Sequence, residues 1–275
     1  MQFHRGPVLD IDPCSNDTPT EAIRVDNLVM KFVSNAEVVT AIAGLSFSIR
    51  SREFVSLVGP SGCGKSTCLG LIAGLQRPSS GEIRICGNLV VGPSRNVGFM
   101  LQKDLLMPWR TLIGNVLFGL EIQGKGGRDA HDRAMHYLER FGLQDFAGRR
   151  PWELSGGMRQ RVALIRTLLV DPDIILLDEP FSALDFQTRL LLENELWRTL
   201  QEEGKTVFLI THDISEAISM SDRILVLSKR PGRLKVTIDV GLASQVRSPL
   251  EARKHPDFNR FFGQVWEQLD VDTHL

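Results

Sequence analysis

One nine-residue segment restricts the possible folds of this chain more than any other feature. GPSGCGKST, at residues 59–67, follows the apolar run EFVSL and precedes the apolar run CLGLIAGL. It fits the pattern G-x-x-x-x-G-K-[ST], in which glycines let backbone N–H groups converge on phosphate oxygens and the helix N-terminus adds positive potential. A strand, this loop and a helix in that order predict an α/β fold with a phosphate site. A glycine turn without a ligand is the structural alternative.

Within this loop, backbone and side chains have different expected roles. Lys65 is expected to reach the β- and γ-phosphates of ATP, and the Ser66 hydroxyl to bind Mg²⁺. Cys63 lies at a helix N-terminus beside Lys65, a setting that lowers a thiol pKa, so we expect alkylation of Cys63 to block ATP binding and MgATP to protect it. The loop residues expected to contact the nucleotide are Gly59, Pro60, Ser61, Gly62, Cys63, Gly64, Lys65, Ser66 and Thr67.

Two later apolar runs, at residues 173–180 (DIILLDEP) and 205–213 (KTVFLITHD), favour parallel strands buried on both faces. The first run ends in Asp178 and Glu179, and adjacent carboxylates at the end of a buried strand require a cation or a polar partner. Asp178 would hold Mg²⁺, directly or through water, and Glu179 would orient and deprotonate an attacking water. A salt-bridged pair that caps the strand is the alternative.

A third signal is LSGGMRQR at residues 154–161. Ser155 is predicted to be a helix N-cap, and Gly156 and Gly157 leave backbone amides exposed at the start of a helix with an apolar face. Free amides at a helix start form an anion site. The alternative is a capped helix that binds no anion. Nothing in this motif alone distinguishes an anion site from a helix that is only capped.

Composition along the chain predicts its organisation. Residues 1–20 contain three prolines and no periodicity, and are expected to form a flexible N-terminal extension. An α/β domain is expected at 21–245, with a helical subdomain inserted at about 103–169, and a C-terminal helical tail at 246–275. In the inserted segment the apolar residues that fall on one helix side are Ala134, Tyr137, Leu138 and Phe141. After Arg230, strand and loop precede the amphipathic segment HPDFNRFFGQVWEQL.

Charge and hydropathy argue against several classes of protein. The chain has 32 Lys and Arg against 33 Asp and Glu, a formal net charge of −1, so no nucleic-acid partner is expected. No apolar run approaches the roughly 18 residues of a membrane helix, and the N-terminus lacks the apolar stretch of a signal peptide. The four cysteines show no metal-binding spacing and are interpreted as reduced thiols of a cytoplasmic protein. Any membrane connection is expected to come through another subunit.

Six motifs occur in the order and spacing of an ABC-transporter ATPase subunit: GPSGCGKST, Gln102, LSGGMRQR, IILLDEP, SALD at 182–185, and His212. The chain resembles this family from about Ile23 to Leu269. The resemblance implies an α/β fold with a P-loop NTPase (RecA-like) core, an N-terminal antiparallel β subdomain and an inserted helical subdomain.

Finer features resemble the importer ATPases for nitrate, aliphatic sulfonates and taurine: LLMPWRTLIGNVLFGLEI, DEPFSALDFQTR and HPDFNRFF. The resemblance implies ATP hydrolysis that powers an importer for a small anion or an organic sulfur or nitrogen compound. Implied partners are transmembrane permease subunits, a second ATP-binding subunit paired head to tail and, indirectly, an extracytoplasmic substrate-binding protein. The implied location is peripheral, on the cytoplasmic face of the inner membrane. Leu101, Ile165 and Thr167 depart from residues usual in the family.

The resemblance also assigns roles in the nucleotide site itself. His212 would contact the γ-phosphate and hold the active geometry. Gln102 would act at the catalytic centre by contacting Mg²⁺ and the nucleotide, and would link the site to the helical subdomain. Phe32 would stack on adenine where most relatives carry Tyr, with a plain core Phe as the alternative.

Further roles implied by the resemblance lie between subunits. Ser155 and Gly157, with Gly156 between them, would contact the γ-phosphate of ATP held by the partner cassette, and Asp185 would couple the two sites. The helical subdomain, together with Leu105, Leu106 and Trp109, would form the docking surface for membrane subunits. A core or loop anchor is the alternative for that apolar segment.

Two other classes of function remain open at this point. A soluble ABC ATPase that acts on DNA or ribosomes usually has paired cassettes or long coiled-coil insertions, and neither is visible here. A fused regulatory or substrate-binding module would need roughly 100 residues, whereas about 45 follow Arg230. An exporter would often carry fused membrane helices, which are absent from this sequence.

Overall fold

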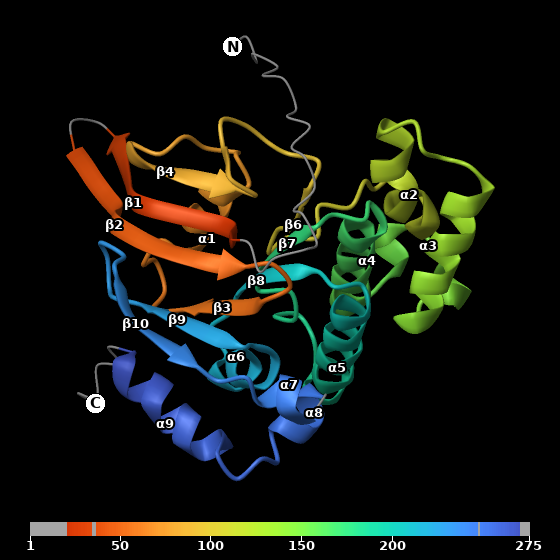
Figure 1. Cartoon of the computed structure of the whole chain (residues 1–275). Helices are drawn as coiled ribbons and strands as arrows, with labels where there is room; N and C mark the ends of the chain where they lie inside the picture. Colours follow the sequence, from red (N-terminus) through yellow and green to blue (C-terminus); the bar gives the residue numbers. More distant parts are fainter. Residues whose placement is uncertain (1–20, 35–36, 247, 270–275) are drawn as a thin grey trace.

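The computed structural model describes residues 21–34, 37–246 and 248–269 (Figure 1). The predicted extension at 1–20 lies outside the described residues, as do residues 270–275 of the predicted tail. At the centre is a six-stranded sheet in which β10 is antiparallel to β9 and the other neighbours are parallel. In spatial order its strands are β10 (Leu234–Asp239), β9 (Arg223–Leu227), β3 (Phe54–Val58), β8 (Thr206–Ile210), β7 (Ile174–Asp178) and β6 (Val97–Met100).

The central strands β3, β7 and β8 are mostly apolar because both of their faces are buried, and the buried Ser56 on β3 is hydrogen-bonded to Ser221. On β3, Phe54 and Val58 belong to the core that contains the helices, whereas Val55 and Leu57 belong to the core under the antiparallel sheet. Successive side chains of a strand point to opposite faces, so a strand between two cores needs an unbroken apolar run. The helices that contribute to the first core include α4 (Gly156–Leu169), α5 (Phe186–Glu202) and α6 (Ile214–Met220).

The second sheet is antiparallel, as predicted for the N-terminal β subdomain, and has four strands among the described residues. Its spatial order is β2 (Glu37–Arg50), β1 (Glu21–Ser34), β4 (Ser80–Ile85) and β5 (Asn88–Leu89). Figure 1 shows this sheet in red and orange on the side of the core sheet that faces α1 (Lys65–Ile72). Apolar residues of the antiparallel sheet, of α1 and of the core strands form one continuous cluster, which fixes the phosphate loop between the two sheets.

The helical insertion lies between β6 and β7, as predicted. It contains α2 (Leu112–Ile122), α3 (Arg128–Arg140), two short 3₁₀ turns at Gln144–Phe146 and Pro151–Glu153, and α4. The four residues predicted to share an apolar face are all buried: Ala134, Tyr137, Leu138 and Phe141. In Figure 1, α2 and α3 project to one side of the core, away from the antiparallel sheet.

The C-terminal part begins its helical region earlier than the sequence predicts. α7 (Leu242–Val246) forms where a loop was expected, because Leu242 and Ala243 are buried in the core and their tertiary contacts outweigh weak local signals. α8 (Pro249–Ala252) and the amphipathic α9 (Phe258–Gln268) follow. Across the described ranges, none of the helices combines the length and apolar character needed for a bilayer span.

Candidate functional site

The phosphate loop connects β3 to α1 and has a backbone that requires glycine. Gly62 has φ 74° and Gly64 has φ 105°, in the left-handed region that side chains with a Cβ rarely adopt. A Cβ on Gly64 would also lie 3.0 Å from the carbonyl oxygen of Ala41. Lys65 is buried, and its Nζ donates hydrogen bonds to the carbonyl oxygens of Gly59 at 2.7 Å and Pro60 at 3.0 Å. The ammonium group is therefore held inside the curve of the loop.

A pocket of about 300 Å³ opens beside this loop. One part of its wall is Phe32, which is 41% exposed, so the alternative of a core phenylalanine is wrong. An exposed aromatic ring beside a phosphate loop is suited to stack on a planar base. The full lining is Phe32, Val39, Ala41, Ser61, Gly62, Gly64, Lys65, Ser66, Thr67, Glu179 and Arg230.

The carboxylate at the end of β7 faces the helix start. Burial raises the pKa of Asp178, and the nearby charge of Glu179 raises it further, whereas a hydrogen bond with the Ser66 side chain and the charge of Lys65 lower it. A hydroxyl and a carboxylate in contact are hard oxygen donors of the kind that Mg²⁺ takes together with substrate phosphates. No cluster of three or more His, Cys, Asp and Glu suited to a metal lies within the described part of the chain.

Three predicted polar residues meet after neighbouring strands. The Gln102 Nε2 donates a hydrogen bond of 3.0 Å to Glu179 Oε2, and His212 Nδ1 lies 3.2 Å from Glu179 Oε1. They follow β6, β7 and β8, whose carboxyl ends lie at one edge of the parallel sheet. Glu179 has φ 49° and its backbone N–H donates to the carbonyl of Ile210, which sets the direction of its side chain. A carboxylate in this position can orient a water and accept its proton.

The loop that carries His212 is fixed by a polar network that sequence reasoning missed. Asp213 accepts hydrogen bonds from the backbone N–H groups of Ser215 and Glu216 and so caps α6. The Arg189 Nη1 on α5 lies 3.1 Å from Asp213 Oδ2, and the Thr211 hydroxyl donates to the buried carboxyl of Glu216. Asp213 stands directly after His212 and precedes a segment with apolar residues at helical spacing, so an aspartate at the N-cap position was the signal available in the sequence.

The segment LSGGMRQR at residues 154–161, hereafter the signature segment, lies away from the phosphate loop. Ser155 accepts a hydrogen bond from the backbone N–H of Met158, which confirms the predicted N-cap of α4. A Cβ on Gly157 would lie 2.6 Å from Leu184 Cδ2, and an added Cβ on Gly156 would lie 3.9 Å from the Cβ of Ala183. These glycines therefore pack against residues 182–185 and do not line the pocket beside the phosphate loop.

Asp185 and the segment before it are tied to the signature helix. Asp185 is exposed and caps α5 by accepting from the backbone N–H of Thr188. Gln160 donates to the Ser182 hydroxyl and accepts from the backbone N–H of Ala183, both at 3.0 Å. No role was predicted for Gln160, although it lies within LSGGMRQR. Its two hydrogen bonds join the two segments expected to face a partner cassette.

Two predictions about cysteine are wrong. Cys63 is fully buried, and burial raises the pKa of its thiol more than the neighbouring Lys65 lowers it. A thiol near a helix N-terminus is activated only when solvent can support the thiolate, and burial removes that support. Cys63 and Cys68 are free, as expected, but Cys86 is disulfide-bonded, because a disulfide depends on three-dimensional proximity and not on local spacing.

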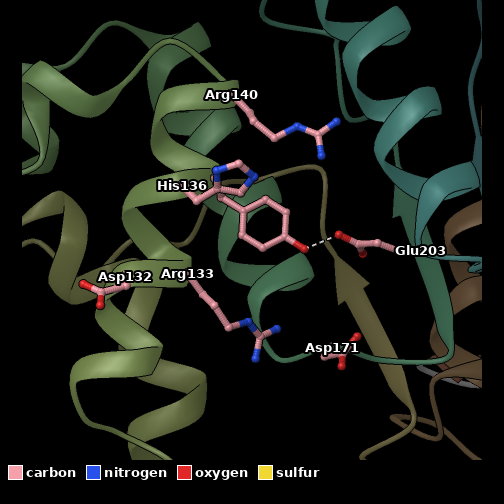
Figure 2. Close-up of a pocket in the computed structure, with 7 residues that line it drawn as sticks. Asp132, Arg133, His136, Arg140, Asp171 and Glu203 are labelled. Carbon is pink, nitrogen blue, oxygen red and sulfur yellow. Dashed lines mark hydrogen bonds between the residues drawn. The ribbon is translucent and has the colours of Figure 1, made fainter.

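A larger pocket, of about 490 Å³, lies elsewhere, and Figure 2 shows the side chains around it. The Tyr137 hydroxyl on α3 donates a hydrogen bond to Glu203 at the end of α5. On the same helix, Arg140 forms ion pairs with Glu195 and Glu202. None of the phosphate-loop residues lines this pocket, and its polar contacts join the helical insertion to the core. The lining is Asp132, Arg133, His136, Tyr137, Arg140, Asp171 and Glu203.

Comparison with known proteins agrees with this geometry. The family model described as ABC transporter matches residues 42–182. The ABC transporter ATP-binding protein YtlC of Bacillus subtilis is 44% identical over 248 residues, which cover 90% of this chain and 95% of that protein. The taurine import ATP-binding protein TauB of Roseobacter denitrificans is 38% identical, over 89% of this chain and 94% of TauB. The nitrate import ATP-binding protein NrtD of Synechocystis sp. is 38% identical, over 88% of this chain and 93% of NrtD.

A solved structure supports the fold and the activity. The dimeric post-hydrolysis state of the ATP-binding cassette MJ0796, bound to ADP and Pi, superimposes with a TM-score of 0.73 at 32% identity. The match covers 79% of this chain and 98% of that cassette. The phosphate loop, the carboxylates after β7 and these similarities lead to one conclusion: this chain belongs to the ABC transporter family, as an ATP-binding subunit that hydrolyses ATP.

Proposed function

We propose that this chain powers an ABC importer for a small anion or an organic sulfur or nitrogen compound, such as nitrate, an aliphatic sulfonate or a taurine-like molecule. The observation that carries the proposal is the similarity, over almost nine-tenths of the chain, to import subunits named for taurine and nitrate. Substrate selection would belong to membrane subunits and to an extracytoplasmic binding protein.

The proposed catalytic roles follow from the contacts described above. Lys65 would hold the β- and γ-phosphates, and Phe32 would stack on adenine. Ser66 and Asp178, with Gln102, would hold Mg²⁺, which when bound neutralises charge on the phosphates. Their oxygen donors fit that ion, and the Ser66 contact to Asp178 already brings two of them together.

Glu179 would act as the general base of hydrolysis. Its carboxylate would orient the attacking water and accept a proton from it. Gln102 and His212, one on each carboxylate oxygen, would set the orientation of the Glu179 side chain. His212 is exposed, and would turn to the γ-phosphate when nucleotide occupies the pocket.

A second cassette would complete each site. Ser155, Gly156 and Gly157 lie outside the pocket beside the phosphate loop, so they can serve ATP only if it is held by another subunit. Free amides at the start of α4 would bind the γ-phosphate of the partner's ATP, and Asp185 would couple the two sites. The dimeric structure of the MJ0796 cassette supports the pairing of two such subunits.

The chain would associate peripherally with the cytoplasmic face of the membrane through permease subunits. Support comes from Trp109 and Leu105, which are 70% and 56% exposed in the segment after Gln102. Exposed large apolar residues in one segment are typical of a protein interface. Arg159 and Arg166 on α4 bond to Asp104 and Leu105, so movement there would reach Gln102.

The test is affinity purification of the chain from detergent-solubilised native membranes, with partners identified by sequencing. We expect a polytopic permease to be recovered with the unsubstituted chain. The same permease should be recovered with the control variant Trp266→Ser, because Trp266 lies on α9 and not in the segment after Gln102. Trp109→Ser should lose the permease and retain ATP binding. The partner binding protein would then be assayed with nitrate, sulfonates and taurine. Recovery only with ribosomes or DNA would refute the transport function and leave the ATPase activity standing.

A further inference from the structure

Arg230 lines the nucleotide pocket although it lies far from the phosphate loop in sequence. It belongs to the loop between β9 and β10, and shares the pocket wall with Phe32, Lys65 and Glu179. None of the six motifs contains it, so the tertiary structure alone brings it to the site.

The backbone around Arg230 is held firmly against the phosphate loop. The Gly232 N–H donates to the carbonyl of Ala41 at 2.9 Å, and the Gly232 carbonyl accepts from Ala43 at 3.0 Å. A Cβ on Gly232 would lie 2.3 Å from the carbonyl oxygen of Cys63, so the two loops pack backbone to backbone. Ser228 closes the same loop by donating through its N–H to the carbonyl of Arg233. The position of Arg230 is therefore coupled to that of the phosphate loop.

The charge of Arg230 is available to a ligand. Its side chain is exposed, and within the described ranges it makes neither a hydrogen bond nor an ion pair. By contrast, the other basic residue of the pocket wall, Lys65, is bonded to two carbonyl oxygens. Arginines elsewhere in the core, such as Arg189 and Arg223, are paired with carboxylates. An unpaired guanidinium beside a phosphate loop has a polyanion as its natural partner, because its planar donors match phosphate oxygens.

We propose that Arg230 is a nucleotide-binding residue whose guanidinium contacts the phosphate chain of ATP from the solvent side of the pocket. This inference rests on the proposed placement of ATP on the phosphate loop. Lys65 would hold the buried part of the phosphate chain and Arg230 the part nearer the pocket mouth. The guanidinium and the Phe32 ring both line this pocket, and they would contact different parts of the same nucleotide.

The test is equilibrium binding of ATP and of adenosine to the full chain, with Glu179→Gln as background to prevent hydrolysis. Arg230→Ala should raise the Kd for ATP by about three- to tenfold, the range of an exposed charge-assisted contact, and Arg230→Lys by less. Adenosine affinity should not change. The matched control is Arg233→Ala, three residues along and also exposed, which should bind ATP normally. The loss in Arg230→Ala should also shrink as salt concentration rises.

Two results would overturn the inference. One is an unchanged Kd for ATP in Arg230→Ala, and the other is an equal loss for adenosine, which would mean stacking on the base. Lys65→Ala measured in parallel separates the inference from the proposed site. Normal ATP binding by Lys65→Ala would refute the proposed site itself. If Lys65→Ala loses ATP affinity and Arg230→Ala does not, only the role of Arg230 is refuted.

Discussion

At the scale of single residues, chemistry here depends on which groups touch and how much water reaches them. Glu179 has a partner on each carboxylate oxygen, Gln102 on one and His212 on the other, and stays partly exposed. Asp178, one residue earlier, is buried and faces the Ser66 hydroxyl. The two adjacent carboxyl groups thus lie in different environments. That of Glu179 is suited to accept a proton, and that of Asp178 is suited to bind a cation.

Replacement of Glu179 by Gln should separate binding from hydrolysis. The amide keeps the size and one acceptor of the carboxylate but cannot take a proton. We expect ATP binding and ATP-dependent dimerisation to persist while turnover falls at least about a hundredfold, the usual contribution of a general base. Phosphate release and analytical ultracentrifugation measure the two properties. Near-normal turnover would remove Glu179 from the role of base.

Cys63 should react slowly with thiol reagents in the native protein. Burial raises the pKa of its thiol, so at neutral pH the thiol is protonated and out of contact with solvent. Labelling with iodoacetamide, followed by peptide mass spectrometry, should show Cys63 modified only after unfolding by urea. Stoichiometric labelling of the native chain at neutral pH would contradict this prediction and restore the idea of an activated thiol.

At the scale of elements, several ionisable side chains lie close together at the N-terminus of α6. Glu216 is buried near Glu193, Asp213 and Arg189, and the Arg253 guanidinium from α8 pairs with Glu193. Burial raises the pKa of Glu216 well above its ordinary value, and the charge of Glu193 raises it further. The hydrogen bond from Thr211 acts in the opposite direction but does not reverse the shift.

Glu216→Gln should therefore reduce the loss of stability at higher pH. Above the ordinary glutamate pKa of 4.5, the unfolded chain releases a proton that folded Glu216 retains, so the free energy of unfolding falls as pH rises toward the folded-state pKa. Gln keeps the Thr211 contact and removes this titration. We expect a higher Tm than the unsubstituted chain at pH 8 and a smaller difference at pH 5.

The matched control is Glu251→Gln, at an exposed glutamate on α8, which should leave the pH dependence of Tm unchanged. Identical pH profiles for Glu216→Gln and the unsubstituted chain would show that Glu216 is ionised in the folded protein. A parallel change in the control would assign the effect to net charge.

At the scale of the whole molecule, polar contacts connect the helical insertion to the core. The Tyr137 hydroxyl on α3 donates a hydrogen bond to Glu203 at the end of α5. Figure 2 marks this bond with a dashed line that ends at Glu203. Arg140 adds ion pairs to Glu195 and Glu202 on α5. These polar contacts lie apart from the pocket beside the phosphate loop, and they join the insertion to the core.

Tyr137→Phe should loosen this connection. Loss of the hydroxyl removes a partly buried hydrogen bond to a carboxylate, and we expect the free energy of unfolding to fall by about 1–2 kcal/mol. Urea denaturation measures the change. His136→Gln is the control, because His136 lines the same pocket but is exposed. Equal stability of Tyr137→Phe and the control would mean that this hydrogen bond contributes nothing.

Local sequence determined the parts of this protein that depend on short-range physics. The apolar runs that become β3, β7 and β8 predict buried parallel strands, since a strand between two cores has no polar face. The glycines of GPSGCGKST predict the phosphate loop because only glycine adopts its left-handed conformations freely. Ser155 likewise predicts the N-cap of α4, because its side-chain oxygen accepts a hydrogen bond from the backbone N–H of Met158, only three residues away.

Tertiary structure decided everything that depends on residues distant in the chain. Gln102 and Glu179 are 77 residues apart in sequence, yet they form a hydrogen bond because parallel strands end at one edge. Burial, which spacing does not encode, made Cys63 a protonated thiol. The packing of one loop on another brought Arg230 into the pocket beside the phosphate loop. Periodicity records which side of an element is apolar, but which elements then meet is settled only when the whole chain packs into its cores.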